Sequence, residues 1–191
     1  MNNRYWMIGL LVILAIICST ALALVNYKTM PVIERNREIT YMRTVLDVFG
    51  ISYDIENSDS IINIYKQRIG KREAGELELF DDNETGATAV SMAGSGFQGP
   101  ISLVVALDGD TISGFKVVSQ VETPGLGARI TEQEFQDSFI GKQASEGLAM
   151  TKSGSAGPRE FDAITGATET SKSLEKILQR GFKRYFEVVN N

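Results

Sequence analysis

The sequence contains no histidine and only one cysteine, Cys18, in its 191 residues. Without histidine, Ser-His-Asp and Cys-His catalysis, His-ligated haem and most catalytic zinc sites are excluded. A single thiol can neither close an internal disulfide nor hold an iron–sulfur cluster. The side chains show no acid–base constellation for substrate chemistry, so we predict no catalytic residue and no metal ligand. Redox chemistry in this protein would therefore require an imported cofactor.

The sequence also lacks an excess of basic residues. Its 19 Lys and Arg against 24 Asp and Glu give a formal net charge of −5. No basic patch with interleaved aromatic residues is present, so a nucleic-acid partner is not expected. The length is sufficient for one folded domain and an anchor.

Charge is absent from Trp6 to Asn26, and Met7–Val25 is almost wholly apolar. About 20 such residues span a bilayer as a helix. Arg4 precedes the run, and Trp6 and Tyr27 lie where interfacial aromatic residues are expected. We therefore predict that residues 1–28 form a single transmembrane anchor in contact with lipid.

The alternative to an anchor is a cleaved signal peptide, because Ala21-Leu22-Ala23 resembles a cleavage site. The apolar run is longer than a typical signal core, which favours the anchor. Basic residues occur on both sides of the run, so charge alone does not determine its orientation.

The rest of the chain has the pattern of an α/β (α+β) domain, residues 51–191, that follows a connecting helix in residues 29–50. Pro31 is predicted to begin that helix and Gly50 to end it. Thr131–Phe139 is predicted as a helix with a capping box formed by Thr131 and Glu134. The remaining elements expected are a short helix near residues 61–65, strands at 76–80, 87–93, 101–107, 111–121 and 148–152, and a long amphipathic C-terminal helix. These elements predict a twisted, mainly antiparallel sheet flanked by helices, in addition to the N-terminal transmembrane helix.

Two strand positions carry more specific expectations. Ile101–Leu107 is a nearly continuous apolar run, which predicts a strand covered on both faces. Gly114 in the next strand predicts a bulge or a close approach of backbone.

The most informative stretch runs from Phe161 to Ser171 and predicts a short strand, a small-residue turn and the start of the C-terminal helix. Thr168 or Thr170 is expected to be the N-cap of that helix. A helix N-terminus offers free backbone N–H groups to an anion, and Gly166 and Ala167 leave room for a ligand. Asp162, before the turn, could cap it or orient a hydroxyl group. The alternative is a capped turn without a ligand.

An internal duplicate supports that alternative. Residues 82–88 repeat the pattern Asp-x-x-Thr-Gly-Ala-Thr of residues 162–168. The first copy leads into a predicted strand, and only the second places its last threonine at a helix N-terminus. The context therefore favours Thr168 over Thr88 as a ligand site.

A second glycine-containing segment, Glu122-Thr123-Pro124-Gly125-Leu126-Gly127, follows a predicted core strand. Pro124-Gly125 indicates a tight turn, and Gly127 would let a flat ligand lie against backbone. Composition alone favours an ordinary loop over a ligand site here. Gly94–Pro100 is a further glycine-rich connection.

Together these stretches are similar to a known family. Residues 162–171 resemble the flavinylation motif of the covalent-FMN domain family, which includes the G subunit of Rnf complexes and the C subunit of Nqr complexes. Residues 122–127 resemble the second motif of that family, and residues 94–107 its glycine-rich strand entry. A single N-terminal membrane helix is also usual in this family.

The resemblance implies FMN joined through its phosphate to Thr168 by a separate, Mg-dependent flavin transferase that uses FAD. The residues implied around the cofactor are Asp162, Thr165, Gly166, Ala167, Glu122, Thr123, Leu126 and Gly127. Gln98 stands where many Nqr relatives carry an aromatic residue, which makes Phe97 the candidate for stacking on the flavin.

The same resemblance implies an electron-transfer subunit of a membrane-bound, ion-translocating oxidoreductase. Length favours an Rnf-type ferredoxin:NAD oxidoreductase, whereas residues 36–50 and 131–142 look similar to Nqr subunits. Implied partners are other membrane and iron–sulfur subunits and the flavin transferase. The FMN domain is expected on the extracytoplasmic side of the cell inner membrane. The alternatives are a stand-alone extracytoplasmic flavoprotein, and a non-redox binding domain in which Thr168 is only a cap.

Overall fold

The computed structural model describes residues 2–152, 154 and 156–189. The chain divides into two compact units, one ending at Ile39 and the other beginning at Thr40. Helix α1 (Asn2–Val48) continues from the first unit into the second. The prediction of an anchor in residues 1–28 and a connecting helix in residues 29–50 stays a prediction, because the helix itself has no break there.

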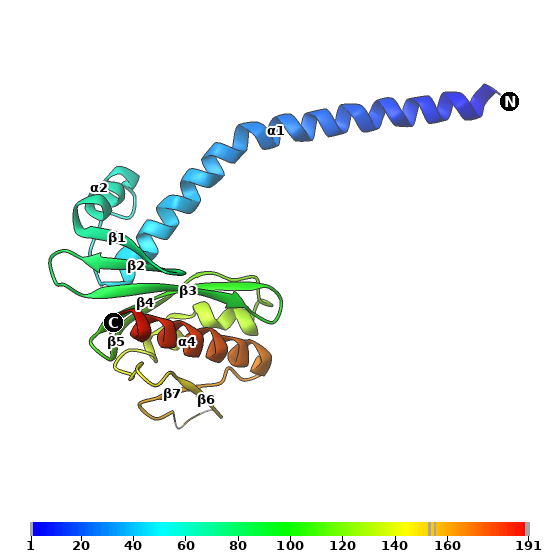
Figure 1. Cartoon of the computed structure of the whole chain (residues 1–191). Helices are drawn as coiled ribbons and strands as arrows, with labels where there is room; N and C mark the ends of the chain where they lie inside the picture. Colours follow the sequence, from blue (N-terminus) through cyan, green and yellow to red (C-terminus); the bar gives the residue numbers. More distant parts are fainter. Residues whose placement is uncertain (1, 153, 155, 190–191) are drawn as a thin grey trace. The chain divides into compact units, whose positions relative to one another are not determined.

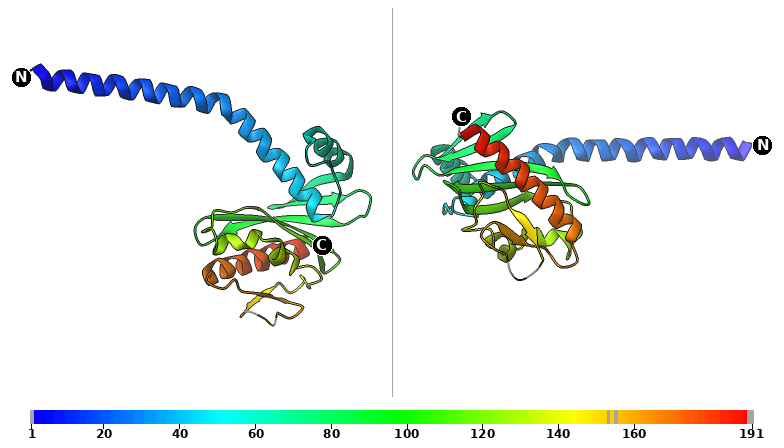
Figure 2. Two further views of the ribbon diagram at one scale, coloured as in Figure 1. Left: turned by 180° about the vertical axis from the view of Figure 1, so that it is seen from behind. Right: turned by 60° about the horizontal axis from the view of Figure 1, so that its bottom comes forward.

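The expected helix start at Pro31 is wrong, because this residue lies inside α1. Proline has no N–H group and cannot donate to the carbonyl of Tyr27, four residues earlier, so it removes one hydrogen bond and favours a bend. α1 bends along its length rather than ending (Figures 1 and 2). The turns on either side keep their own hydrogen bonds, and the helix continues through the proline.

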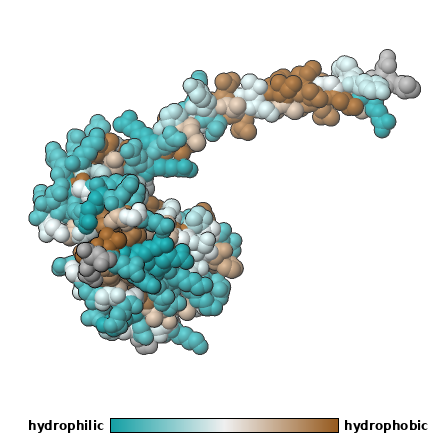
Figure 3. Space-filling view, in the orientation of Figure 1, coloured by the Kyte–Doolittle hydropathy of each residue, from teal (hydrophilic) through white to brown (hydrophobic). Residues whose placement is uncertain are grey.

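The N-terminal part of α1 carries apolar side chains on its surface (Figure 3). Within Arg4–Val48 there is a segment long and apolar enough to cross a membrane, and none of it is buried against other parts of the protein. A signal sequence near an N-terminus would meet the same criterion. An apolar surface of this kind is stable in lipid rather than in water.

The second unit is built on a five-stranded antiparallel meander (Figure 1). Its strands follow chain order and are β1 (Ile69–Ala74), β2 (Leu77–Asp82), β3 (Thr88–Ser95), β4 (Pro100–Asp108) and β5 (Thr111–Ser119). Edge strand β1 is the one that the sequence did not predict, because it is polar and exposed. Cross-strand ion pairs hold it to β2, namely Lys71 with Glu78 at 2.8 Å and Arg72 with Asp81 at 2.6 Å.

Both faces of the sheet are covered, as predicted for β4, which is buried from Ile101 to Leu107 except at Ser102. On one face Phe80 contacts Tyr41, near the end of α1, with ring centroids 5.9 Å apart. On the other face α4 (Thr168–Val189) packs along the sheet (Figure 1). Its periodic apolar residues are buried there, which confirms the predicted amphipathic helix.

The predictions for Gly50 and Gly114 are confirmed. The Gly50 N–H bonds the Asp47 carbonyl and the Ile51 N–H bonds the Leu46 carbonyl, which ends α1 in a Schellman motif. The pairing of β4 with β5 shifts by one residue next to Gly114. A Cβ atom at Gly114 would lie only 1.9 Å from the Val48 carbonyl oxygen, so the end of α1 packs directly on the strand.

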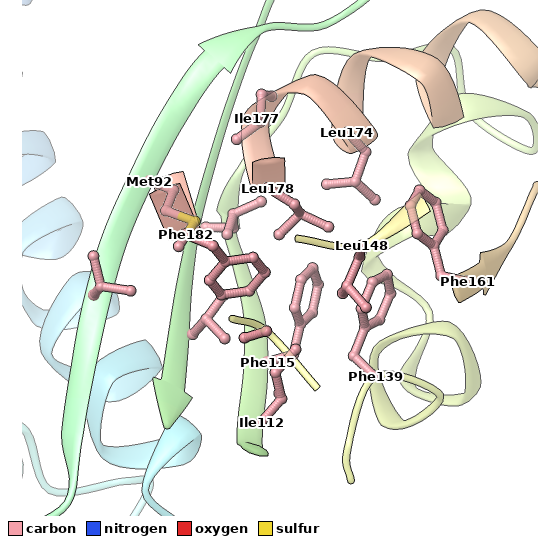
Figure 4. Close-up of a cluster of buried hydrophobic side chains, with 14 of the residues drawn as sticks. Met92, Ile112, Phe115, Phe139, Leu148, Phe161, Leu174, Ile177, Leu178 and Phe182 are labelled. Carbon is pink, nitrogen blue, oxygen red and sulfur yellow. The ribbon is translucent and has the colours of Figure 1, made fainter. Parts of the chain in front are cut away.

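An aromatic core connects the sheet to the C-terminal segments (Figure 4). Phe115 of β5 stacks on Phe139 with centroids 4.1 Å apart, and Phe139 contacts Phe161 at 5.3 Å. Phe161 is the central residue of β7 (Glu160–Asp162), which pairs in parallel with β6 (Ala149–Thr151). This core therefore fixes the position of the turn that follows β7.

Two shorter helices complete the domain. α2 (Ser58–Arg68) is capped by Asn57, whose side chain accepts from the N–H groups of Asp59 and Ser60. The predicted helix 131–139 is wrong in its bounds, since a 3-10 helix η1 (Gly127–Thr131) precedes α3 (Gln133–Asp137). The capping box is also wrong. The Thr131 hydroxyl donates to the Ala128 carbonyl of η1, and α3 has no side-chain cap.

We expect the free energy of unfolding to fall in acid, because protonation of the Asp82 carboxylate removes a stabilising interaction. Arg68 donates two hydrogen bonds to this buried carboxylate, and together with Thr85 and the Glu84 N–H it lowers the pKa of Asp82 to about 2. A lowered folded-state pKa stabilises the fold at neutral pH, and roughly 1–2 kcal/mol should be lost as the pH falls from about 4 to about 2. Urea unfolding across this pH range measures the loss.

The matched comparison for this prediction is Asp82→Asn against the exposed Asp108→Asn. Asp82→Asn should be less stable at pH 7 and should lose less stability between about pH 4 and 2. Asp108→Asn should follow the wild type. Equal acid sensitivity of the wild type and Asp82→Asn would contradict the assignment.

Candidate functional site

A cleft of about 350 Å³ lies where the loop after β5 meets the N-terminus of α4. Eight of the ten predicted site residues line it, together with two residues of the first turn of α4. The lining consists of Phe97, Glu122, Thr123, Leu126, Gly127, Gly166, Ala167, Thr168, Glu169 and Thr170. The fold thus brings together three segments that are separate in the sequence.

The turn between β7 and α4 forms the first wall. Gly166 has φ +83°, a conformation that side-chain-bearing residues rarely adopt. The buried Ser171 hydroxyl accepts from the Ile164 N–H and donates to the Ala167 carbonyl, both at 3.0 Å. The N–H of Ser171 also bonds the Ala167 carbonyl. Ser171 therefore holds the turn in shape.

The expectation that Thr168 or Thr170 is the N-cap is wrong. α4 begins at Thr168, and Ala167 precedes it. The buried Thr170 hydroxyl donates to Glu122 at 2.7 Å instead of to its own helix. Thr168 is exposed in the first turn of α4 and lines the cleft.

The first turn of α4 presents unused hydrogen-bond donors. Within the described residues, no acceptor is present for the backbone N–H groups of Thr168, Glu169 and Thr170. The first N–H groups of a helix lack partners within it, and the helix dipole adds positive potential there. This corner is therefore suited to an anion such as a phosphate.

The second wall is the 122–127 loop, centred on the buried Glu122. One oxygen of its carboxylate accepts from the N–H groups of Phe97 at 2.7 Å and Gln98 at 3.0 Å. Its other oxygen accepts from the Thr170 hydroxyl. A Cβ atom on Gly127 would lie 2.5 Å from the Thr170 oxygen and 2.7 Å from the Glu122 carboxylate. Gly127 thus makes room for the hydrogen bond between Glu122 and Thr170. The sequence by itself predicts that this glycine makes room for a ligand.

The third wall is the 96–99 turn with Phe97, which, together with Leu126 of the second wall, places apolar side chains beside the polar groups. Phe97 is 61% exposed and Leu126 45% exposed, although both line the cleft. Large exposed apolar side chains in a concave site are typical of ligand binding. They would contact a flat ring while the α4 N-terminus takes its anionic group.

The two remaining predicted residues do not line the cleft. Thr165 is exposed in the turn. The Asp162 carboxylate accepts from the Gly154 N–H at 2.9 Å, which holds the loop before β7. Sequence reasoning gave no role to Glu169 or Ser171 and considered Thr170 only as a helix cap, although the position of all three after Thr168 in the first helical turn was a signal for them.

The duplicate motif has the same turn and a different surrounding. Gly86 has φ +75°, close to that of Gly166. Thr88 then enters β3 rather than a helix, and its half-buried hydroxyl donates to Asp81 at 2.7 Å. The Thr85 hydroxyl donates to Asp82 at 2.6 Å. Both hydroxyls of the first copy are therefore bonded to carboxylates, whereas Thr168 is exposed at a helix N-terminus.

Comparison with known proteins agrees with this geometry. The profile of the FMN-binding domain family matches residues 96–183, which include all three walls of the cleft. The G subunit of the Na(+)-translocating ferredoxin:NAD(+) oxidoreductase complex of Acetobacterium woodii is 30% identical over 184 residues, which cover 92% of this chain and 88% of that protein. The chain belongs to the FMN-binding subunit family of Rnf and Nqr complexes.

Members of both branches of the family are similar to this chain. The C subunit of the Na(+)-translocating NADH-quinone reductase of Neisseria meningitidis is 35% identical over 103 residues, which are 50% of this chain and 40% of that protein. The crystal structure of the corresponding C subunit from Parabacteroides distasonis has a TM-score of 0.70 at 22% identity and covers 83% of this chain and 95% of that one. This likeness confirms the predicted fold class.

The residues of the cleft fit FMN in this family. FMN combines a flat ring system with a phosphate. The cleft offers exposed apolar side chains beside three N–H groups that have no acceptor among the residues the structure describes. The turn at Gly166 brings backbone to the surface, where a Cβ atom would be 3.2 Å from Leu126. These groups would allow the phosphate of FMN to lie at the α4 N-terminus and its ring system to lie against Phe97 and Leu126.

Ser171→Ala should destabilise the turn between β7 and α4 that forms the first wall of the cleft. The change leaves the buried Ile164 N–H without its acceptor, which costs about 1–3 kcal/mol. Urea unfolding of the full chain in detergent measures the cost. Ser173→Ala, two residues along the same helix, is the control and should change stability by less than about 0.5 kcal/mol. Equal effects of the two substitutions would contradict a role of Ser171 in the turn.

Proposed function

We propose that this protein is the electron-transfer subunit of a membrane-bound, ion-translocating oxidoreductase of the Rnf type and carries covalently bound FMN. The observation that carries the proposal is the cleft in which the exposed Thr168 begins α4 opposite the 122–127 loop. Bound FMN supplies one- and two-electron redox chemistry that the side chains of this sequence lack.

Thr168 is the proposed attachment residue. Thr168 is exposed, and the N–H groups of the first turn of α4 could donate to a phosphate joined to its hydroxyl. In the proposed transfer from FAD, the Thr168 O–H bond would be replaced by a bond from the Thr168 oxygen to the FMN phosphorus. The bond between that phosphorus and the bridging oxygen of the pyrophosphate would break, and the bridging oxygen would leave with AMP. The hydroxyl proton passes to solvent or to a base of the transferase. A covalent link lets the cleft remain open for electron exchange without loss of the cofactor.

The other residues of the cleft bind and orient. Phe97 and Leu126 give apolar surface for the ring system and exclude water from part of it. Glu122 and Thr123 belong to the loop that forms the opposite wall, and Gly166 and Ala167 leave the phosphate corner free of bulk. The proposed role of these groups is to hold a flavin for electron exchange with other cofactors.

Partners follow from the relatives. The Acetobacterium woodii relative belongs to a ferredoxin:NAD(+) oxidoreductase complex, and its alignment extends over most of both chains. This supports an Rnf-type complex, with membrane and iron–sulfur subunits as partners and a flavin transferase for maturation. An Nqr-type complex is the second candidate, because the Neisseria relative belongs to an NADH-quinone reductase.

We propose that α1 anchors the protein as a single pass in the inner membrane, with the FMN domain outside the cytoplasm. The apolar segment of α1 supports the anchor. The side of the membrane rests on the family resemblance, in which flavin transfer takes place outside the cytoplasm.

Covalent attachment predicts a defined mass increase. Wild type and Thr88→Ala, produced together with a flavin transferase, should each gain the mass of one FMN less one water. Thr168→Ala should gain none, since it lacks the hydroxyl that forms the ester. Intact-mass spectrometry and in-gel flavin fluorescence measure both. Retention of flavin in Thr168→Ala with loss in Thr88→Ala would refute the attachment site, and no covalent flavin in any of the three would refute the proposed function.

The proposed membrane side predicts labelling from outside the cell. Cys18 is the only native thiol, so Cys18→Ser combined with Lys66→Cys places one thiol on exposed α2. A membrane-impermeant maleimide should label this variant in cells whose outer barrier is permeabilised and whose inner membrane is intact. Cys18→Ser alone should stay unlabelled. Labelling only after the inner membrane is disrupted would place the domain in the cytoplasm.

A further inference from the structure

Glu122 carries a buried carboxylate beside the cleft, and the hydrogen-bond partners of this carboxylate are groups of the protein itself. Its side chain joins all three walls at once, through Phe97, Gln98 and Thr170. One oxygen accepts two backbone N–H groups and the other accepts a hydroxyl. Three of the about four acceptor positions of the carboxylate are therefore used within the protein.

We infer that Glu122 is a positioning residue that clasps the 96–99 turn to the first turn of α4, rather than a group that binds the flavin. The clasp holds Phe97 against the cleft and fixes the first turn of α4 at the same time. Its relation to FMN rests on the proposed function, whereas the clasp itself is a property of the protein without cofactor.

The glycines around Glu122 support this role. A Cβ atom on Gly96 would lie 2.3 Å from one carboxylate oxygen, and one on Gly127 would lie 2.7 Å from the other. Both contacts are far below van der Waals separation, so each glycine leaves room for the carboxylate. The two glycine-containing segments of the sequence are thus shaped around this one side chain.

The neighbouring segments are fixed at further points. The Gly96 N–H bonds the Gly99 carbonyl at 2.7 Å, which closes the 96–99 turn. The Glu122 N–H bonds the Gln120 side chain, at 2.5 Å. Within the residues that the structure describes, the turn is hydrogen-bonded to α4 only through Glu122. Loss of the carboxylate would therefore free the turn and Phe97 while leaving β4 and β5 paired.

The test separates position from charge with two substitutions at one residue. In Glu122→Gln, the side-chain oxygen can still accept from Phe97 and Gln98, and the amide can donate to the Thr170 oxygen. In Glu122→Ala, every link is lost. Asp82→Asn is the control for lower stability at a distance from the cleft, and Thr170→Val removes only the link to α4.

Backbone hydrogen exchange of the full chain in detergent, without flavin, is the first measurement. Exchange at the Phe97 and Gln98 amides should be at least about tenfold faster in Glu122→Ala than in wild type, because each amide loses a hydrogen bond to a charged group, which is stronger than one to a neutral group. Glu122→Gln and Asp82→Asn should stay within about threefold of wild type after correction for stability. Thr170→Val should leave the Phe97 and Gln98 amides protected.

Visible circular dichroism of the flavin-loaded protein is the second measurement, because it reports the fixed surroundings of the ring. The signal per flavin should fall at least about twofold in Glu122→Ala and should be retained in Glu122→Gln, as expected if Phe97 is held by the clasp. Asp82→Asn should keep the wild-type signal. A merely destabilising effect would not distinguish Glu122→Ala from Asp82→Asn.

Three results would overturn the inference. Wild-type exchange at Phe97 and Gln98 in Glu122→Ala would show that the clasp does not hold the turn. Equal loss of dichroism in Glu122→Gln and Glu122→Ala would show that the charge acts directly on the flavin. If Glu122→Ala does not fold, the folded Glu122→Gln provides the test. Fast exchange at Phe97 and Gln98 in that variant would contradict the expectation that a neutral side chain in the same position still holds the turn. Absence of flavin in wild type would count against the proposed function alone, because the exchange experiment needs no cofactor.

Discussion

The packing of α4 along one face of the five-stranded sheet decides where every wall of the cleft lies. The helix begins at Thr168, directly after a turn whose position is set by Phe161 in the aromatic core. A Cβ atom on Gly181 would lie 2.2 Å from Met92 of β3, so the helix approaches the sheet closely (Figure 4). Interiors packed at this density transmit displacement. A shift of α4 would therefore move the anion corner away from the 122–127 loop.

The two copies of one short motif show how the surroundings change what a local turn presents. Both copies of Asp-x-x-Thr-Gly-Ala-Thr form a turn with a left-handed glycine, at Gly86 and at Gly166. In the first copy the chain continues as a strand, and the final hydroxyl is bonded to Asp81. In the second copy a helix follows, which presents unpaired N–H groups and a dipole at the same point. The two copies share the same residues and the same turn, and they differ in whether a strand or a helix follows.

Much of the architecture could be predicted because it rests on local pattern. The patterns of apolar residues located β2 to β5, with β4 marked by a nearly continuous apolar run, and the helical periodicity after Thr168 located α4. The sequence-based predictions were wrong where two local structures differ little in free energy. Pro31 is tolerated inside α1 at the loss of one hydrogen bond. Thr131 closes a 3-10 turn instead of capping α3. Strand β1 is polar, and its ion pairs with β2 carry no periodic signal.

For the site, the sequence by itself determined the chemistry available. It has no histidine and one thiol, and it has two glycine-containing segments and a hydroxyl at a predicted helix start. Only the tertiary structure decided that Glu122 bonds Thr170, 48 positions away, and that Asp162 lies outside the cleft. Periodicity and motif spacing report contacts within an element. A contact between a loop and a distant helix depends on how the sheet brings them together, which no local pattern encodes.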